Sequence, residues 1–298
     1  MKILPAGIFA LVLLAFTASG QTASQVAPLS DPGNTGGWVL NPSVSDEFNE
    51  PHLNDSKWLI QGKDGVYKSK WIGRAPSQFS PDNVRVEDGM LKLQTRWQPD
   101  YPFSKKLDLT HLAKDGKGRA YQNFTTAAVI AKHAFRYGYL EIRCKAANAS
   151  VTSAFWGTGG GSEVDVFEIL GAPTRPAEKN TERRFQSNII DWSKEAKDNR
   201  RKWRGKYFFD WRPADAFHVY GAAWDENGIK FFADGKLIQS ITKEELGKGW
   251  VLTQPIALWV DSETFPWDGL PTKESLPAEY EIDYIRVWQK APPSHQGS

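Results

Sequence analysis

The stretch of sequence that decides the fold is Ser162-Glu-Val-Asp-Val-Phe-Glu168. It sets three carboxylates among β-branched and aromatic residues, a composition typical of a β-strand. Side chains alternate between the two faces of a strand, so Glu163 and Asp165 point the same way and Glu168 points the other way. One extra residue near 166–167, a β-bulge, brings all three acids onto one face and turns the apolar side chains mainly into the core.

Three carboxylates on one face repel one another, which is a poor device for stability. Like charges in contact raise the pKa of at least one member of the group. Two carboxyls with separated pKa values, one ionised and one protonated, are what the cleavage of a glycosidic bond requires. The alternative for an isolated E-x-D-x-x-E pattern is an ordinary strand with a solvated acidic face, and the rest of the chain has to decide between the two.

The N-terminus has the pattern of a secretory signal. Lys2 gives the positive start, residues 3–16 are largely apolar, and small residues follow at 17–20. The apolar stretch is too short for a comfortable membrane span of about twenty residues. We therefore expect a signal peptide over 1–20, a flexible leader over 21–37, and a secreted protein, extracellular or periplasmic, with no membrane span in the mature chain.

The length suits one large β-sandwich or barrel as well as two small domains, and the composition makes the chain a candidate for binding carbohydrate. Cys144 is the only cysteine, so an intramolecular disulfide is excluded and the core alone has to hold the fold. The thiol is expected to be buried rather than nucleophilic. A net charge of +2 creates no field for nucleic acid or membranes. The 13 Trp, 9 Tyr and 16 Phe are the outlier in the composition: some of them have to form the core, but the flat faces of sugars also stack on Trp and Tyr rings.

Short alternating segments with Gly and Asp turns between them predict an all-β protein, a curved antiparallel β-sandwich. Asp88-Gly89 joins strands at 83–87 and 90–95 as a hairpin. Segments 127–132 and 137–145 are expected to form another pair. Further strands are expected at 154–156, 163–170, 217–224, 229–233, 236–240, 256–260 and 280–289, with a helical turn at 243–247. We expect one catalytic domain over 38–290 and a C-terminal tail over 291–298.

Two long irregular stretches, 99–123 and 171–212, interrupt this pattern. Long loops in compact domains are usually functional or mobile. The second carries a basic run at 194–206, which we expect to be a solvated surface loop; the alternative is a contact with an anionic substrate. His218 lies in an apolar strand and is expected to be structural. His52, His111 and His133 form no metal-ligand spacing.

The chain resembles glycoside hydrolase family 16 from about Trp38 to Lys290. The acidic strand matches that family's E-x-D-x-x-E signature in its bulged form. Further segments fit in the same order: Asp46-Glu-Phe48 with Trp58, Tyr137-Gly-Tyr-Leu-Glu-Ile-Arg143, Ser153-Ala-Phe-Trp156, Phe217-His-Val-Tyr-Gly-Ala-Ala-Trp224, Asp234-Gly235 and Ile282-Asp-Tyr-Ile-Arg-Val-Trp288. The resemblance implies a β-jelly roll with an open cleft on its concave face.

Two segments resemble the branch of that family that degrades red-algal galactans, the β-agarase and β-porphyranase type. They are Trp71-Ile-Gly-Arg-Ala-Pro76 with Phe79 and Asn83-Val84, and Trp259-Val-Asp-Ser-Glu-Thr-Phe265 with Trp267 and Gly269-Leu-Pro271. One departure concerns Gln186-Ser-Asn-Ile-Ile190, where the agarases compared usually carry a His and this chain has none. The departure bears on which galactan is cleaved, not on the family.

The resemblance implies a retaining mechanism with Glu163 as nucleophile and Glu168 as acid/base. Asp165 is expected to hydrogen-bond Glu163 and to help keep Glu168 protonated. Retaining enzymes hold the two working carboxyls about 5–5.5 Å apart. A flat strand rising about 3.3 Å per residue separates the outer pair by more than that, so this step rests on the resemblance.

Four further residues are candidates for substrate binding. Trp71 and Trp156 are expected to be stacking platforms, with a core role as the alternative for each. The planar fork of Arg74 suits sugar hydroxyls or a sulfate. Glu263 is expected to bind a sugar hydroxyl.

The leading hypothesis is therefore an endo-acting hydrolase of agarose, porphyran or a related sulfated galactan. The same chemistry on β-1,3- or mixed-linkage β-glucans is the second hypothesis, and a non-catalytic carbohydrate-binding jelly roll is the third. The acid trio argues against the third, because a lectin gains nothing from crowded carboxylates. A polysaccharide is the expected partner, a monomer is the expected state, and no cofactor or metal is expected; a structural calcium would leave no signature in the sequence.

Overall fold

The computed structural model describes residues 26–110 and 116–290. The predicted signal peptide, the C-terminal tail and His111 lie outside these residues. The described part contains no helix that is long and apolar enough to cross a membrane.

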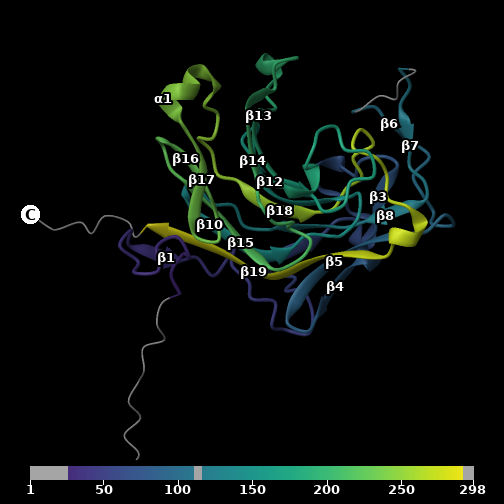
Figure 1. Cartoon of the computed structure of the whole chain (residues 1–298), viewed down its shortest axis with the longest axis horizontal. Helices are drawn as coiled ribbons and strands as arrows, with labels where there is room; N and C mark the ends of the chain where they lie inside the picture. Colours follow the sequence, from purple (N-terminus) through teal and green to yellow (C-terminus); the bar gives the residue numbers. More distant parts are fainter. Residues whose placement is uncertain (1–25, 111–115, 291–298) are drawn as a thin grey trace, which may run out of the picture.

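Within the described residues, two sheets form the fold, and they are antiparallel except for the parallel pair β3–β8. The larger has the order β17-β16-β15-β10-β19-β5-β8-β3, with β1 on β19 and β4 on β5. The smaller has the order β14-β13-β12-β11-β18-β9-β2. In Figure 1 the larger sheet, with β5 and β19, forms the lower layer, and the smaller sheet, with β12 and β18, lies above it. This is the expected all-β sandwich.

The larger sheet is made of β1 (Trp38–Leu40), β3 (Ser77–Phe79), β4 (Val84–Glu87), β5 (Met90–Trp97), β8 (Phe124–Thr126), β10 (Gly138–Lys145), β15 (His218–Trp224), β16 (Gly228–Ala233), β17 (Lys236–Thr242) and β19 (Ala278–Lys290). The smaller is made of β2 (Trp58–Ile60), β9 (Ala128–Ala131), β11 (Thr152–Gly159), β12 (Ser162–Leu170), β13 (Arg184–Asp191), β14 (Arg201–Phe208) and β18 (Ala257–Asp261). A small hairpin, β6 (Leu107–Asp108) with β7 (Arg119–Ala120), and a helical turn, α1 (Lys243–Leu246), complete the elements used below.

The core lies between the two sheets. Phe167 of β12 packs on Tyr220 of β15, with ring centroids 4.9 Å apart, and so joins the smaller sheet to the larger. Val164 and Val166 belong to the same buried cluster as Ile142 of β10. Because one face of β12 is fully occupied by this core, its acidic side chains are left on the face that points away from the larger sheet.

The predicted β-bulge is confirmed in β12. Asp165 pairs with Trp156 of β11 and Phe167 pairs with Phe155, so Val166 is the extra residue. On the other side of β12, the register with β13 also shifts between Asp165 and Glu168. The expected hairpin is confirmed as well: β4 and β5 pair, and Asp88 and Gly89 have the positive φ angles that such a turn needs.

Two predictions about connectivity are wrong. Segments 127–132 and 137–145 form strands but do not pair: β9 lies in the smaller sheet between β2 and β18, and β10 lies in the larger between β15 and β19. The chain between them passes from one sheet to the other instead of making a hairpin turn. The stretch 171–212, expected to be irregular, contains β13 and β14, so the basic run 194–206 ends in an edge strand rather than in a loop.

The leader expected over 21–37 differs in its described part. Residues 26–37 form consecutive turns that are anchored to the larger sheet. The backbone N–H of Leu29 donates to Glu141 at 2.8 Å, and the indole of Trp288 donates to the carbonyl of Val26 at 2.6 Å. These buried partners give the segment fixed hydrogen bonds that its Pro, Ser and Gly composition alone did not predict.

Candidate active site

A cavity of 440 Å³ lies on the exposed face of the smaller sheet. In Figure 1, β13 and β14 rise on one side of this face and the segment with β6 and β7 rises on the other. The cavity walls include every candidate that the sequence singled out: Trp71, Arg74, Trp156, Glu163, Asp165, Glu168 and Glu263. The structure therefore brings together residues that are up to 192 positions apart in the chain.

The acids of β12 are held by donors from β13 and the segment just after it. The side-chain amide of Asn188 donates to Asp165 Oδ2 at 2.8 Å and to Glu168 Oε2 at 2.9 Å. Gln186 Nε2 donates to the same oxygen of Glu168 at 3.1 Å. The indole of Trp192 donates to Glu163 Oε2 at 2.9 Å. Each acid is thus oriented by a neutral donor, which fixes its position without cancelling its charge.

Asp165, which was expected to hydrogen-bond Glu163, accepts a hydrogen bond from the side chain of Asn188. Asp165 faces Asn188 directly across the β12–β13 ladder, and the amide is close enough to bridge Asp165 to Glu168. An amide can donate where two carboxylates would only repel each other, unless one of them is protonated.

Burial favours the protonated forms of two members of the trio. It raises the pKa of Glu163 to about 7, and the charge of Glu168 acts in the same direction, while the Trp192 hydrogen bond and Arg74 oppose it. Burial also raises the pKa of Asp165 well above its ordinary value, with Glu163 and Glu168 adding to the effect. The free site therefore keeps protons among its carboxyls at neutral pH.

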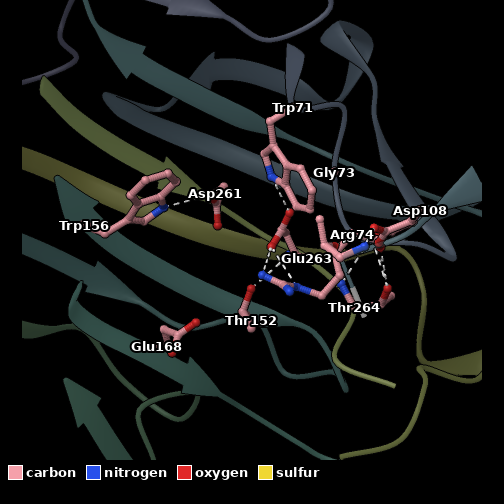
Figure 2. Close-up of polar contacts among 12 residues, drawn as sticks. Trp71, Gly73, Arg74, Asp108, Thr152, Trp156, Glu168, Asp261, Glu263 and Thr264 are labelled. Atoms are coloured by element: carbon pink, nitrogen blue, oxygen red, sulfur yellow. Dashed lines mark hydrogen bonds and ion pairs between the residues drawn. The ribbon is translucent and has the colours of Figure 1, made fainter. Parts of the chain in front are cut away.

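Glu263 forms the opposite wall of the cavity with Trp71 and Arg74, as Figure 2 shows. The Trp71 indole donates to Glu263 Oε1 at 2.8 Å, and Arg74 Nε and Nη2 approach Oε2 at 3.2 and 3.1 Å. The Arg74 guanidinium also lies 5.0 Å from the ring centroid of Phe265. The charge of Arg74 is thus balanced by Glu263, and the cluster offers the cavity a hydrogen-bonded but nearly neutral wall.

Trp156 is half-buried and lines the floor of the cavity. One face of its ring stacks on Trp259 at 4.6 Å with planes 22° apart. Its indole donates to Asp261 Oδ2 at 2.8 Å (Figure 2). Burial, together with Glu263, raises the pKa of Asp261 well above its ordinary value. The ring is therefore fixed in place, as a rigid stacking surface has to be.

Four residues of the site were not singled out as site residues in the sequence: Gln186, Asn188, Trp192 and Asp261. Asn188 and Gln186 lie in the segment where the expected His is missing, and their amides supply the hydrogen bonds to Asp165 and Glu168. The signal that would have found them is the alternation in Arg184–Asp191, in which Phe185 and Ile189 join the hydrophobic core and the polar Gln186 and Asn188 lie between them.

Two residues expected to be structural lie outside this cavity. His218 stacks on Trp211 with centroids 3.5 Å apart and contacts Asp234 Oδ2 at 2.8 Å. Cys144 is buried, and burial raises the pKa of its thiol far above the ordinary value, so the thiolate is not available at neutral pH. Both expectations are confirmed.

Comparison with known families matches this site to sugar hydrolysis. The family model described as "Beta-porphyranase A-D, GH16 domain" matches residues 38–290. The chain belongs to glycoside hydrolase family 16. It is therefore a glycoside hydrolase, and the jelly roll with its acidic strand is the family 16 fold, as the sequence resemblance implied.

Individual relatives agree with this assignment. The chain is 28% identical to β-porphyranase B of Phocaeicola plebeius over 86% of this chain and 85% of the relative. It is 26% identical to a β-agarase of the same organism, over 88% and 89% of the two chains. The crystal structure of porphyranase B from Zobellia galactanivorans superposes with a TM-score of 0.66 at 25% identity, covering 85% of this chain and 92% of that one.

Proposed function

We propose that this family 16 enzyme is an endo-acting hydrolase of β-linked red-algal galactans, with porphyran and agarose as the first substrates to test. The observation that carries the proposal is the match of the β-porphyranase family over 38–290, which includes the whole cavity. Relatives named β-porphyranase and β-agarase support the same substrate class. A cavity open along a sheet face suits the middle of a polymer better than its end.

In the first proposed step, Glu163 is the nucleophile and Glu168 is the acid. The ionised Glu163 attacks the anomeric carbon, the bond from that carbon to the glycosidic oxygen breaks, and Glu168 gives its proton to the leaving oxygen. The products of this step are a glycosyl ester on Glu163, an ionised Glu168 and the shortened leaving chain. The bulge at Val166 supports these roles, since it puts both carboxyls on one face of β12.

In the second step, water hydrolyses the ester. Glu168, now ionised, takes a proton from the water as its oxygen attacks the same anomeric carbon, and Glu163 leaves as a carboxylate. Two displacements at one carbon retain the anomeric configuration. The step returns the proton to Glu168 and the charge to Glu163, so the site is ready for the next chain.

We assign a positioning role to Asp165 and Asn188. Asp165 lies between the two working acids, and its raised pKa keeps a proton next to them. Asn188 ties Asp165 to Glu168 through a single amide. The pair holds Glu168 in the orientation from which it can donate its proton and later accept one.

The proposed sugar-binding surface consists of the wall formed by Trp71, Arg74 and Glu263 and of Trp156 on the floor. The Trp156 ring, packed on Trp259, presents its free face to a sugar near the acids. The Arg74–Glu263 pair presents both a donor and an acceptor to sugar hydroxyls. Because the pair is nearly neutral, it is better suited to hydroxyl recognition than to binding a sulfate on its own.

The experiment that tests the proposal is incubation of the purified protein with porphyran, agarose, carrageenan and laminarin, followed by analysis of the released oligosaccharides. We expect a ladder of oligosaccharides from at least one red-algal galactan. Release from laminarin alone would replace the proposal with the β-glucanase alternative. Binding without release from any of the polymers would support the lectin alternative.

We further propose that the enzyme acts outside the cytoplasm as a monomer and without a cofactor. The signal-like residues 1–20 support export. Mass spectrometry of the secreted protein would show a start after the predicted cleavage, and light scattering would give a single-chain mass. Activity that survives treatment with a chelator would support the absence of a catalytic metal.

A further inference from the structure

Two arginines lie on the same sheet face as the acids, at the edge of the smaller sheet. Arg204 of β14 is opposite Asn188 of β13, which is opposite Asp165 of β12. Arg201 is opposite Ile190, which is opposite Glu163. Cross-strand neighbours point to the same side of a sheet, so both arginines face the side on which the acids lie.

A second bulge is what places Arg201 on this side. The register between β13 and β14 shifts so that Ile189 pairs with Trp203 and Ile190 with Arg201, and Lys202 is the extra residue. Without the bulge, residues three apart would face opposite sides of the strand. Lys202 itself turns to the other face, where it pairs with Asp191 at 3.5 Å.

Neither arginine has a carboxylate within ion-pair distance among the residues that the structure describes. Their basic neighbours on the same two strands do: Lys202 pairs with Asp191, and Arg184 and Lys206 share Glu178. Arg204 is exposed, and its Nε donates to Asn188 Oδ1 at 3.3 Å. That contact leaves the two terminal nitrogens of Arg204 free to bind a ligand.

The two guanidinium groups also repel each other. Partial desolvation and then the charge of Arg201 lower the pKa of Arg204, while the more distant charge of Glu168 opposes them. Two like charges held together without an ion-pair partner cost stability, whereas an anion bound between them would relieve the repulsion. The planar forks of two arginines match the oxygens of a sulfate ester.

We propose that Arg201 and Arg204 form a subsite for the sulfate ester of the sugar on the leaving-group side of the scissile bond. The side is assigned from the link to Glu168, the proposed acid for the leaving oxygen. Trp156 lies on β11, on one side of the acidic strand, while the arginines lie on β14, on the other. Arg204 reaches Glu168 through Asn188. This inference rests on the proposed function and specifies its substrate as a sulfated galactan.

The test is a binding measurement that does not depend on turnover. In a Glu163→Gln background, affinities for porphyran oligosaccharides and for the same oligosaccharides after chemical desulfation are measured by calorimetry. We expect the sulfated form to bind more tightly, and we expect Arg201→Met and Arg204→Met each to reduce that preference by about tenfold, the effect of losing one charge-assisted hydrogen bond. Lys202→Met is the matched control: it removes the same charge from the same strand but from the opposite face, and it should keep the preference.

The outcomes separate this inference from the proposed function. Equal affinity for sulfated and desulfated chains, or a preference that the arginine variants retain, would overturn the sulfate subsite. A similar loss in Lys202→Met would also overturn it, since the effect would then be one of general charge. Hydrolysis of galactans by the wild-type protein is scored separately, so the subsite can fail while the galactanase proposal stands.

Discussion

The side-chain amide of Asn188 lies 2.9 Å from Glu168 Oε2 and donates to it. The same amide lies 2.8 Å from Asp165 Oδ2 and so connects the middle acid of β12 to the last one. Glu168 is therefore held from the neighbouring strand, by a residue 20 positions further along the chain.

Asn188→Ala is expected to lower kcat by roughly tenfold to a hundredfold with a smaller change in KM. The reason is that a lost hydrogen bond to a charged group is worth about 1.5–3 kcal/mol, and Glu168 acts in the chemical step. Steady-state kinetics on the substrate found in the polymer panel provides the measurement. A rise in KM at unchanged kcat would assign Asn188 to substrate binding instead.

The pH profile should show an acidic limb near neutral pH. Burial and the charge of Glu168 raise the pKa of Glu163 to about 7, and only the ionised form can attack. We expect kcat/KM to fall about tenfold for each pH unit below that value. An acidic limb close to the ordinary pKa of a glutamic acid would contradict either the role of Glu163 or the buried state of its carboxyl.

Asp165→Asn is expected to stabilise the fold while reducing activity. The pKa of Asp165 is higher in the folded protein than in the unfolded chain. The stability that the protonated carboxyl contributes is therefore fully present at a pH below the pKa of the unfolded chain, and it is lost as the pH rises through the pKa of the folded protein. An amide carries no charge to bury and can donate to its acidic neighbours. We expect Tm to rise by a few degrees, roughly 2–4 °C for each kcal/mol at this chain length, at pH 8 and to change little at pH 4. A lower Tm at pH 8 would show that the carboxyl makes contacts which the amide cannot replace.

Arg74 and Glu263 should be coupled in stability. Their side chains are 16% and 7% exposed, and removing one partner from a buried ion pair costs about 3–5 kcal/mol because a charge is left unpaired. Arg74→Met should therefore destabilise the protein by about that amount, and adding Glu263→Gln should recover part of the loss. Additive effects in urea denaturation would mean that the pair does not act as a unit.

The features predicted best from the sequence were those that depend on local geometry. The alternation of Ser162–Glu168 required a bulge to align three acids, and the bulge is present at Val166. The turn at Asp88-Gly89 followed in the same way from the φ angles that a tight hairpin demands. Every predicted site residue also lines the cavity. The family resemblance had indicated the segments around Trp71 and Glu263 together with the acids.

The features that the sequence did not yield depend on contacts between distant segments. Strands at 128–131 and 138–145 follow one another in the chain but belong to different sheets, and no local signal separates that case from a hairpin. β14 was missed because an edge strand keeps charged side chains such as Arg204 exposed and has little apolar alternation. Missing β13 and β14 hid Asn188 as a partner of the acids.

The central claim, that Glu163 is the nucleophile of a glycoside hydrolase, is tested most directly by the activity of Glu163→Gln. The amide oxygen of the variant can still accept the hydrogen bond from Trp192, so the fold and sugar binding should persist. The exposed Glu244→Gln on α1 is the matched control and should keep normal activity. We predict that Glu163→Gln binds the galactan but turns it over at least roughly a thousandfold more slowly than the wild-type protein. Near-normal turnover in that variant would contradict the account.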